Sequence, residues 1–253
     1  MSDAVLARQA TPRSTGAAPD RRWSASRVAG AIVLAAWAGL FWFLLLSGRD
    51  AFYLSTRTEW IVPVAAALLT AATLGRLASS RVGLPEPLRR RELAVMAAMV
   101  VPVLLVAVLP PATLGTFSAD KRSGFAGTGV GSSARDIESG ELTFVDIAAA
   151  QTTPEGERAL AGRAGETVEL VGIVTRYPDT PVDEFLLTRY VVTCCVADAT
   201  VAQVRVVNVT PGVFDDNDWV KVSGTIYPLG REVIVNAAQL DAVARPERPY
   251  LSA

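Results

Sequence analysis

The chain has 253 residues, 51% of them hydrophobic, a length that allows one large domain or two small ones. It contains no histidine, so neither a Ser-His nor a Cys-His catalytic pair can form within it. The formal net charge of −1 hides an acidic C-terminal part, because from Gly165 onward twelve Asp and Glu residues outnumber seven Lys and Arg residues. Such a surface repels phosphate backbones, which argues against nucleic-acid binding.

Apolar segments occupy the N-terminal half. Residues 1–27 are predicted to form a disordered cytoplasmic tail. Val28–Ser47 has 20 residues without a charge, enough to cross a hydrocarbon core of about 30 Å; a cleaved signal peptide is the alternative. Trp60–Leu74 and Ala94–Leu109 are shorter and could instead form a buried hairpin of soluble helices, but the 20-residue uncharged run upstream favours insertion. The sequence therefore predicts three transmembrane helices within residues 28–111.

The distribution of Lys and Arg predicts the orientation of these spans. Ten basic residues precede the first span or lie between the second and the third, whereas two lie between the first and the second. We therefore expect a multi-pass protein of the cell membrane with a cytoplasmic N-terminus and an extracytoplasmic C-terminal domain. The ten are Arg8, Arg13, Arg21, Arg22, Arg27, Arg76, Arg81, Arg89, Arg90 and Arg91, and the two are Arg49 and Arg57.

Residues 112–140 are rich in glycine and serine and are predicted to be a flexible tether between the membrane and the outer domain. Within them, Gly127–Ser133 resembles a phosphate-binding loop. No strand precedes this run and no Gly-Lys-Ser/Thr follows it, so we interpret it as linker.

Short β-like runs dominate residues 141–253. Leu142–Ile147 is a possible first strand, and Pro154–Ala161 a short helix with Thr153 as its N-cap. Gly172 is expected to mark a bulge or a bend. The pattern predicts an all-β domain, an OB-like small barrel, with a β-sandwich as the alternative. The expected strands are 167–175, 184–194, 201–209, 219–227 and 232–237, followed by an extended tail at 244–250.

The two cysteines of the chain are adjacent, at Cys194 and Cys195, and a carboxylate follows at Asp198. On a regular strand the two thiols would point to opposite faces, but if the chain turns here both thiols and Asp198 can converge. Three interpretations stay open. The thiols pack in the core as small hydrophobic groups. Alternatively, Cys194, Cys195 and Asp198 bind a soft metal ion such as Cu(I) or Zn²⁺, alone or with a ligand from a partner or a second copy.

The third interpretation of the pair is a vicinal disulfide. Adjacent Cα atoms lie about 3.8 Å apart, below the usual range for a disulfide, so the bond would be strained and easily reduced. A strained bond suits a redox switch better than a structural cross-link.

Two further features are weaker candidates for a site. Residues 215–218 read Asp-Asp-Asn-Asp and could hold a hard cation such as Ca²⁺, but they lack the spacing of an EF-hand loop, so a solvated turn is favoured. Arg189 could lower the pKa of a thiol if it lies on the same side of its strand, or it could pair with Asp183 or Glu184.

The run that contains both cysteines and Asp198 resembles the signature of the YcgQ-like family of bacterial membrane proteins, an uncharacterised family. The resemblance extends over most of residues 30–253. Its matching pieces are Phe185–Ala199, Val171–Val174 with Arg176, Trp219–Gly224, Pro246–Leu251, and Tyr53-Leu54 with Arg57.

Members of that family usually accompany a larger polytopic membrane protein that resembles a permease. The resemblance therefore implies a membrane-anchored accessory subunit of a two-component permease-like transporter, whose outer domain caps or delivers solute. The chain departs from the family in its long Gly/Ser tether and its three spans. The alternative is an extracytoplasmic thiol-redox or soft-metal-binding sensor. No nucleotide motif or catalytic dyad supports an enzyme.

Overall fold

The computed structural model describes residues 22–82, 88–122, 124, 137–138, 140–230 and 232–252. Most of the predicted tail, residues 1–21, and residues 123, 125–136 and 139 of the predicted tether lie outside these described residues. The chain divides into two compact units, one with Met1–Gly39 and Ala67–Leu105, the other with Leu40–Ala66 and Val106–Ala253.

Three helices are each long and apolar enough to cross a membrane, as the sequence predicts. Each has at least 18 residues, so each reaches about 27 Å or more at 1.5 Å per residue. The two shorter apolar runs reach this length because their helices also take in flanking residues. The helices are α1 (Ala25–Ser47), α2 (Ile61–Ala78) and α3 (Arg90–Val108).

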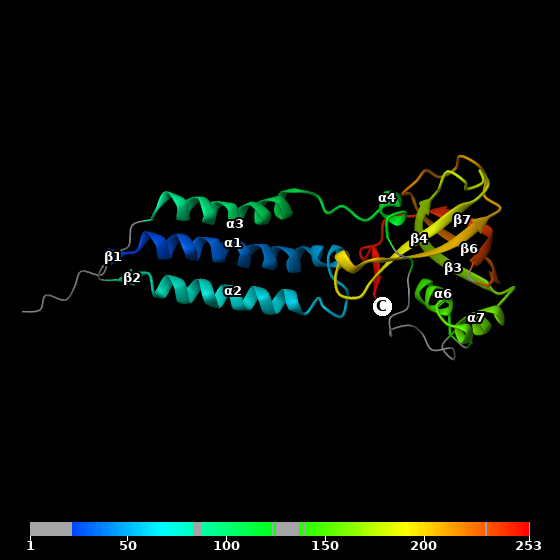
Figure 1. Cartoon of the computed structure of the whole chain (residues 1–253), viewed down its shortest axis with the longest axis horizontal. Helices are drawn as coiled ribbons and strands as arrows, with labels where there is room; N and C mark the ends of the chain where they lie inside the picture. Colours follow the sequence, from blue (N-terminus) through cyan, green and yellow to red (C-terminus); the bar gives the residue numbers. More distant parts are fainter. Residues whose placement is uncertain are drawn as a thin grey trace, which may run out of the picture. The chain divides into compact units, whose positions relative to one another are not determined.

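Within the first unit, the helices lie side by side (Figure 1). The indole nitrogen of Trp37 on α1 donates to the carbonyl of Met99 on α3 at 3.2 Å, and Arg27 donates to the carbonyl of Ser79 after α2 at 2.7 Å. Before α1 and after α2, β1 (Arg22–Trp23) and β2 (Arg81–Val82) pair antiparallel. Of the most apolar window of each helix, 22% is buried in α1 and 6% in α3, so α3 is the span least covered by its own chain.

The second unit contains a closed five-stranded barrel of the predicted OB-like type. Its pairings run β3–β6–β7–β5–β4 and return from β4 to β3; the β5–β7 pair is parallel and the other four are antiparallel. A sixth strand, β8, pairs parallel with the end of β4. The strands are β3 (Thr167–Thr175), β4 (Phe185–Val192), β5 (Thr200–Val207), β6 (Trp219–Leu229), β7 (Glu232–Ala242) and β8 (Tyr250–Ser252).

The barrel interior is filled by alternate side chains of its strands, as a period of two requires. Phe185, Leu187 and Val191 of β4 belong to this core, as do Val204 and Val206 of β5. All five are at most 2% exposed. The strand pattern seen in the sequence therefore corresponds to one closed hydrophobic core.

The expected strand over Leu142–Ile147 is wrong, because the structure has helix α6 (Phe144–Ala150) there. Thr143 and Asp146 form a capping box in which each side chain accepts from the backbone amide of the other. The short apolar run alone does not distinguish a helix from a strand. The expected helix α7 (Pro154–Ala161) is confirmed, with the Thr153 hydroxyl accepting from the Gly156 amide as its N-cap. Both helices pack against the barrel (Figure 1).

Gly172 serves close packing and does not mark a bulge. The register of β3 with β6 runs unbroken across it. A Cβ at this position would lie 2.8 Å from the carbonyl oxygen of Thr188 and 2.9 Å from Cγ of Leu187, which identifies a close approach of β4. The register shift in the barrel falls instead at Ser223 and Gly224, between β6 and β7.

A second hydrophobic cluster lies on the outer face of β4 and includes Tyr190, Val192 and Tyr250. Helix α4 (Thr116–Ala119), inside the segment predicted as tether, adds Ala119 to it. The Tyr190 hydroxyl donates to the carbonyl of Gly115 at 2.6 Å, and the Leu114 amide donates to the Tyr250 hydroxyl at 3.1 Å. The described part of the tether segment up to residue 122 is therefore held on the barrel.

Candidate functional site

The two cysteines lie just beyond the end of β4. The strand ends at Val192, the chain bends at Thr193 and Cys194, and a single 3-10 turn η2 (Val196–Asp198) leads into β5. Cys194 is exposed and Cys195 is partly exposed. The chain therefore turns at the cysteines, which is the condition under which the sequence allows both thiols and Asp198 to converge.

Asp198 holds this turn in shape. Its Oδ1 accepts from the amide of Thr193 at 3.0 Å, and its Oδ2 accepts from the amides of Cys194 and Cys195 at 2.8 and 3.3 Å. In return, the Asp198 amide donates to the sulfur of Cys195. Partial burial acts to raise the pKa of Asp198, but the hydrogen bonds from Cys194, Thr193 and Cys195 outweigh it and leave the pKa below its ordinary value. The carboxylate is thus ionised at neutral pH.

The thiols converge on the same side of the turn. The Cys194 thiol donates to the Cys195 sulfur across 3.7 Å, and both sulfurs and a carboxylate oxygen of Asp198 lie within 4.8 Å of one another. Among the described residues this is the one cluster of three Cys, Asp or Glu side chains with the spacing of metal ligands. The three residues predicted as ligands are therefore brought together in space.

The Cys194 thiol is not activated as a nucleophile. Its hydrogen bond to Asp198, followed by its hydrogen bond to Cys195, raises the pKa of Cys194 to about 11. Reactive cysteines have the opposite shift, because they sit near cations that stabilise the thiolate. At neutral pH the Cys194 thiol is protonated and slow to react.

The loop between α1 and α2 closes over the turn. Leu54 forms an isolated antiparallel bridge with Cys195, and the Val196 amide donates to the Tyr53 carbonyl at 2.8 Å. The carbonyl of Cys194 accepts from the Ser55 amide at 3.2 Å and from the Thr58 hydroxyl at 2.5 Å.

Ser55 completes this contact. Its hydroxyl donates to the carbonyl of Thr193 at 2.8 Å, and the residue is 1% exposed. We call residues 53–58 the clasp loop. The contact joins positions more than 130 residues apart, and the only signal for it in the sequence is the match of Tyr53-Leu54 in the family resemblance.

Further contacts tie the clasp loop and the residues that flank it to the segment around β8. Glu59 forms an ion pair with Arg248 at 2.6 Å, the Thr56 amide donates to the Ser252 hydroxyl at 3.1 Å, and the Arg245 guanidinium lies 4.8 Å from the centre of the Phe52 ring. The connection between α1 and α2 is therefore part of the barrel unit.

Arg189 takes none of the roles considered for it from the sequence. Its guanidinium lies 5.1 Å from the centre of the Trp219 ring and donates to the carbonyls of Val171 and Arg248. Glu184 pairs with Arg205 instead. Burial lowers the pKa of Arg189 to about 10, and Arg189 is not among the groups that shift the pKa of Cys194. Its position ties β3, β4 and the segment before β8 together.

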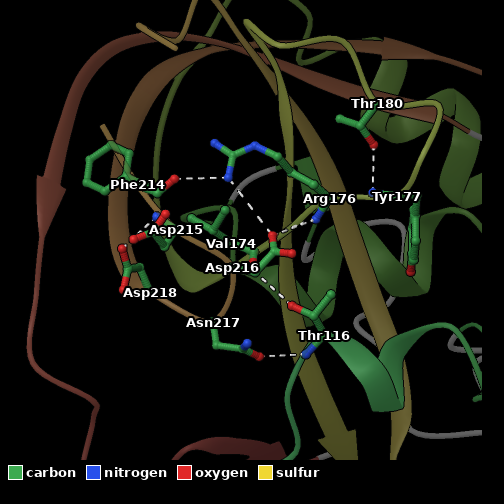
Figure 2. Close-up of polar contacts among 10 residues, drawn as sticks. All are labelled: Thr116, Val174, Arg176, Tyr177, Thr180, Phe214, Asp215, Asp216, Asn217 and Asp218. Atoms are coloured by element: carbon green, nitrogen blue, oxygen red, sulfur yellow. Dashed lines mark hydrogen bonds and ion pairs between the residues drawn. The ribbon is translucent and has the colours of Figure 1, made fainter. Parts of the chain in front are cut away.

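The acidic loop at residues 215–218 is a structural turn (Figure 2). The Asp215 amide donates to Oδ2 of Asp218 at 2.8 Å, and the Arg176 amide donates to Oδ1 of Asp216 at 3.1 Å. Oδ1 of Asn217 accepts from the amide of Thr116 at 2.7 Å. Because Asp216 and Asn217 hold neighbouring segments and Asp218 closes the loop itself, we favour the turn over the cation site.

The family model of the DUF1980 C-terminal domain, an uncharacterised family, matches residues 157–252. The match begins in α7, ends in β8 and takes in the whole barrel with Cys194, Cys195 and Asp198. A comparison with curated proteins finds no match. The barrel is thus similar to a domain of an uncharacterised family, and any function has to be argued from the geometry.

Proposed function

We propose that this protein is a membrane-anchored accessory subunit of a two-component permease-like transporter, with its barrel outside the cytoplasm capping the partner or delivering solute to it. One observation carries the proposal: the clasp loop, which connects the candidate spans α1 and α2, is hydrogen-bonded directly to the Cys194-Cys195 turn. A ligand bound at the turn would therefore lie at the part of the barrel that is hydrogen-bonded to the connection between α1 and α2. The role is one of binding and assembly, without catalysis by this chain.

Two properties of the helices support the proposal. Basic residues concentrate before α1 and between α2 and α3, which favours a cytoplasmic location for those segments and an extracytoplasmic barrel. On α3, Val101, Leu104 and Leu105 are each at least 50% exposed. This apolar surface is available to the lipid bilayer and to helices of a larger polytopic, permease-like partner.

Site-specific photo-crosslinking in native membranes tests the assembly. A photoreactive residue at Leu104, which is 57% exposed on α3, is expected to crosslink to a polytopic membrane protein. The matched control places the same residue at Ala31, which is 1% exposed on α1, and is expected to give no intermolecular product. Crosslinks from Leu104 to lipid alone would contradict the accessory role.

A second candidate function is an extracytoplasmic thiol-redox or soft-metal-binding sensor. It is favoured by the pair of exposed Cys194 and partly exposed Cys195, whose sulfur atoms lie 3.7 Å apart. The raised pKa of Cys194 speaks against rapid thiol–disulfide exchange and leaves metal binding as the better form of this candidate. The sensor predicts that a Cys194→Ser/Cys195→Ser variant loses its response to metal while assembly with a partner is irrelevant to that response.

A further inference from the structure

We propose that the solute handled at this turn is a tetrahedral d10 metal ion, with Zn²⁺ as the ion that fits best, bound by Sγ of Cys194 and Cys195 and one oxygen of Asp198, with the fourth position open for transfer to an acceptor. The transfer step rests on the proposed function above. Binding of the ion by the isolated chain does not depend on it.

The distance between the sulfurs selects the geometry of the ion. A tetrahedral centre with Zn–S bonds of about 2.3 Å separates two sulfurs by about 3.8 Å. The sulfurs of Cys194 and Cys195 lie 3.7 Å apart before any ion is bound. A linear two-coordinate ion such as Cu(I) with bonds of the same length would need about 4.6 Å, so the turn would have to open to accept it.

Asp198 has one acceptor site left for the ion. An ionised carboxylate offers about four lone-pair sites, and the amides of Thr193, Cys194 and Cys195 occupy three of them. The fourth site lies near the Cys194 thiol, whose single proton is directed at the Cys195 sulfur. This site is available to the ion, and the oxygen has to move by no more than about 1.3 Å to complete a tetrahedral edge.

Binding of the ion is coupled to the release of protons. Each thiol gives up its proton to solvent as its sulfur forms a bond to the ion, so binding of one Zn²⁺ releases two protons. The bound cluster then carries two thiolates and one carboxylate against the two positive charges of the ion.

Three protein ligands leave the fourth position of a tetrahedral ion without a ligand from this chain. Structural zinc sites have four protein ligands, whereas sites that act on another molecule keep one position free. Among the described residues, no fourth Cys, Asp or Glu joins this cluster, and the chain has no histidine. Because Cys194 is exposed, a donor atom of a second molecule can reach the fourth position. Such a site can pass its ion to another molecule. The clasp loop holds the turn in place through hydrogen bonds to the carbonyls of Thr193 and Cys194.

Competitive titration of the full chain in lipid nanodiscs tests the binding. With a chromophoric chelator as competitor and a phosphine as reductant, we expect one Zn²⁺ per chain and two protons released at pH 7. X-ray absorption of the loaded chain is expected to give two sulfur and two lighter ligands. Cys194→Ser and Cys195→Ser should each weaken binding by more than about 100-fold, beyond the effect usual for outer groups of a metal site.

Matched variants separate ligand loss from charge loss. Asp198→Asn is expected to weaken Zn²⁺ binding, while Asp179→Asn, which removes an exposed carboxylate elsewhere in the barrel unit, is expected to leave it unchanged. Equal Zn²⁺ affinity of the natural chain and the Cys194→Ser/Cys195→Ser variant overturns the site. Four sulfur ligands would mean that two chains share the ion, which overturns the open position.

The outcomes distinguish this inference from the proposed function. Zn²⁺ binding without a crosslinked polytopic partner would contradict the accessory role and support the metal site. A crosslinked partner together with a chain that binds no Zn²⁺ keeps the accessory role and overturns the metal as its solute.

Discussion

In the barrel, the turn at residues 193–198 and the turn at residues 215–218 are each closed by an aspartate that accepts from the amide three residues before it. Asp198 accepts from Cys195, and Asp218 accepts from Asp215. The same local motif leads to different uses. In the acidic loop Asp216 and Asn217 are bound to Arg176 and Thr116, whereas in the cysteine turn the two sulfurs face each other with one of them exposed.

The difference lies in what the backbone of each turn contacts. The cysteine turn is anchored on the clasp loop through its carbonyls, which accept from Ser55 and Thr58, so among the described residues no side-chain hydrogen bond ties its two sulfurs to a neighbouring segment. The acidic loop is anchored largely through its side chains, which are then unavailable. A candidate binding site is therefore a place where the backbone is anchored while polar side chains make no contact with neighbouring segments.

The largest effect is expected from removing the backbone anchor of the cysteine turn. A Ser55→Ala/Thr58→Val variant removes two hydroxyl donors to the carbonyls of Thr193 and Cys194 and leaves these carbonyls without those partners. We expect a loss of about 2–3 kcal/mol in the free energy of unfolding. Amide exchange at residues 193–196 should rise together with it.

The control for this change is Thr210→Val, which alters an exposed threonine of the same unit. Denaturant unfolding and hydrogen exchange measure both variants. If the clasp variant is as stable as the control and its turn exchanges no faster, the clasp loop does not anchor the turn.

The acidic loop should respond to changes in side chains. Asn217 has a positive φ of 73° and its Oδ1 accepts from the Thr116 amide. Asn217→Ala loses the hydrogen bond and strains the backbone, so we expect a loss of about 2 kcal/mol, while Asn217→Gly loses only the hydrogen bond and should cost about 1 kcal/mol. Thermal unfolding of the two variants measures the difference. Equal losses would show that the backbone conformation is not strained by alanine.

The sequence predicts the barrel because its strands alternate in hydrophobicity and each is bounded by turn residues. It predicts the three donors because Cys194, Cys195 and Asp198 are near neighbours, and the remaining condition was a turn after Val192. The strand expected at Leu142–Ile147 was wrong because a run of six residues carries no clear period. Its capping pair, Thr143 and Asp146, was the signal for a helix.

The clasp loop could not be predicted from local patterns. Its contact with the cysteine turn joins positions 53–58 to 193–196, and the hydrogen bonds involve carbonyls that every residue has. Likewise, Arg189 offers several partners in the sequence, and its choice of two carbonyls and Trp219 depends on where β3 and β8 meet β4. Such long-range backbone contacts need the closed barrel before they exist.

Removal of the Asp198 charge should make the thiols reactive. Asp198 is the main cause of the raised pKa of Cys194, so Asp198→Asn is expected to lower that pKa and to increase the thiolate fraction at pH 8 by at least about tenfold. The initial rate of alkylation of the metal-free chain measures it. The corresponding change in the other turn, Asp218→Asn, should leave the rate as it is. The same alkylation rate in all three proteins would show that Asp198 does not cause the raised pKa of Cys194.

The smallest effect is expected in the pH dependence of stability. Because the folded state raises the pKa of Cys194 from 9.0 to about 11, it retains a proton that the unfolded chain loses. The associated stability is fully present below pH 9 and is lost as the pH rises toward 11. Tyr190 and Tyr250 also have raised pKa values and add to the alkaline loss in every variant that keeps them. Between pH 8 and pH 11, the free energy of unfolding of the metal-free chain should therefore fall slightly less for Cys194→Ser than for the natural chain. Denaturant unfolding at the two pH values measures it. An identical decline in both proteins would mean that the turn does not hold the proton of Cys194.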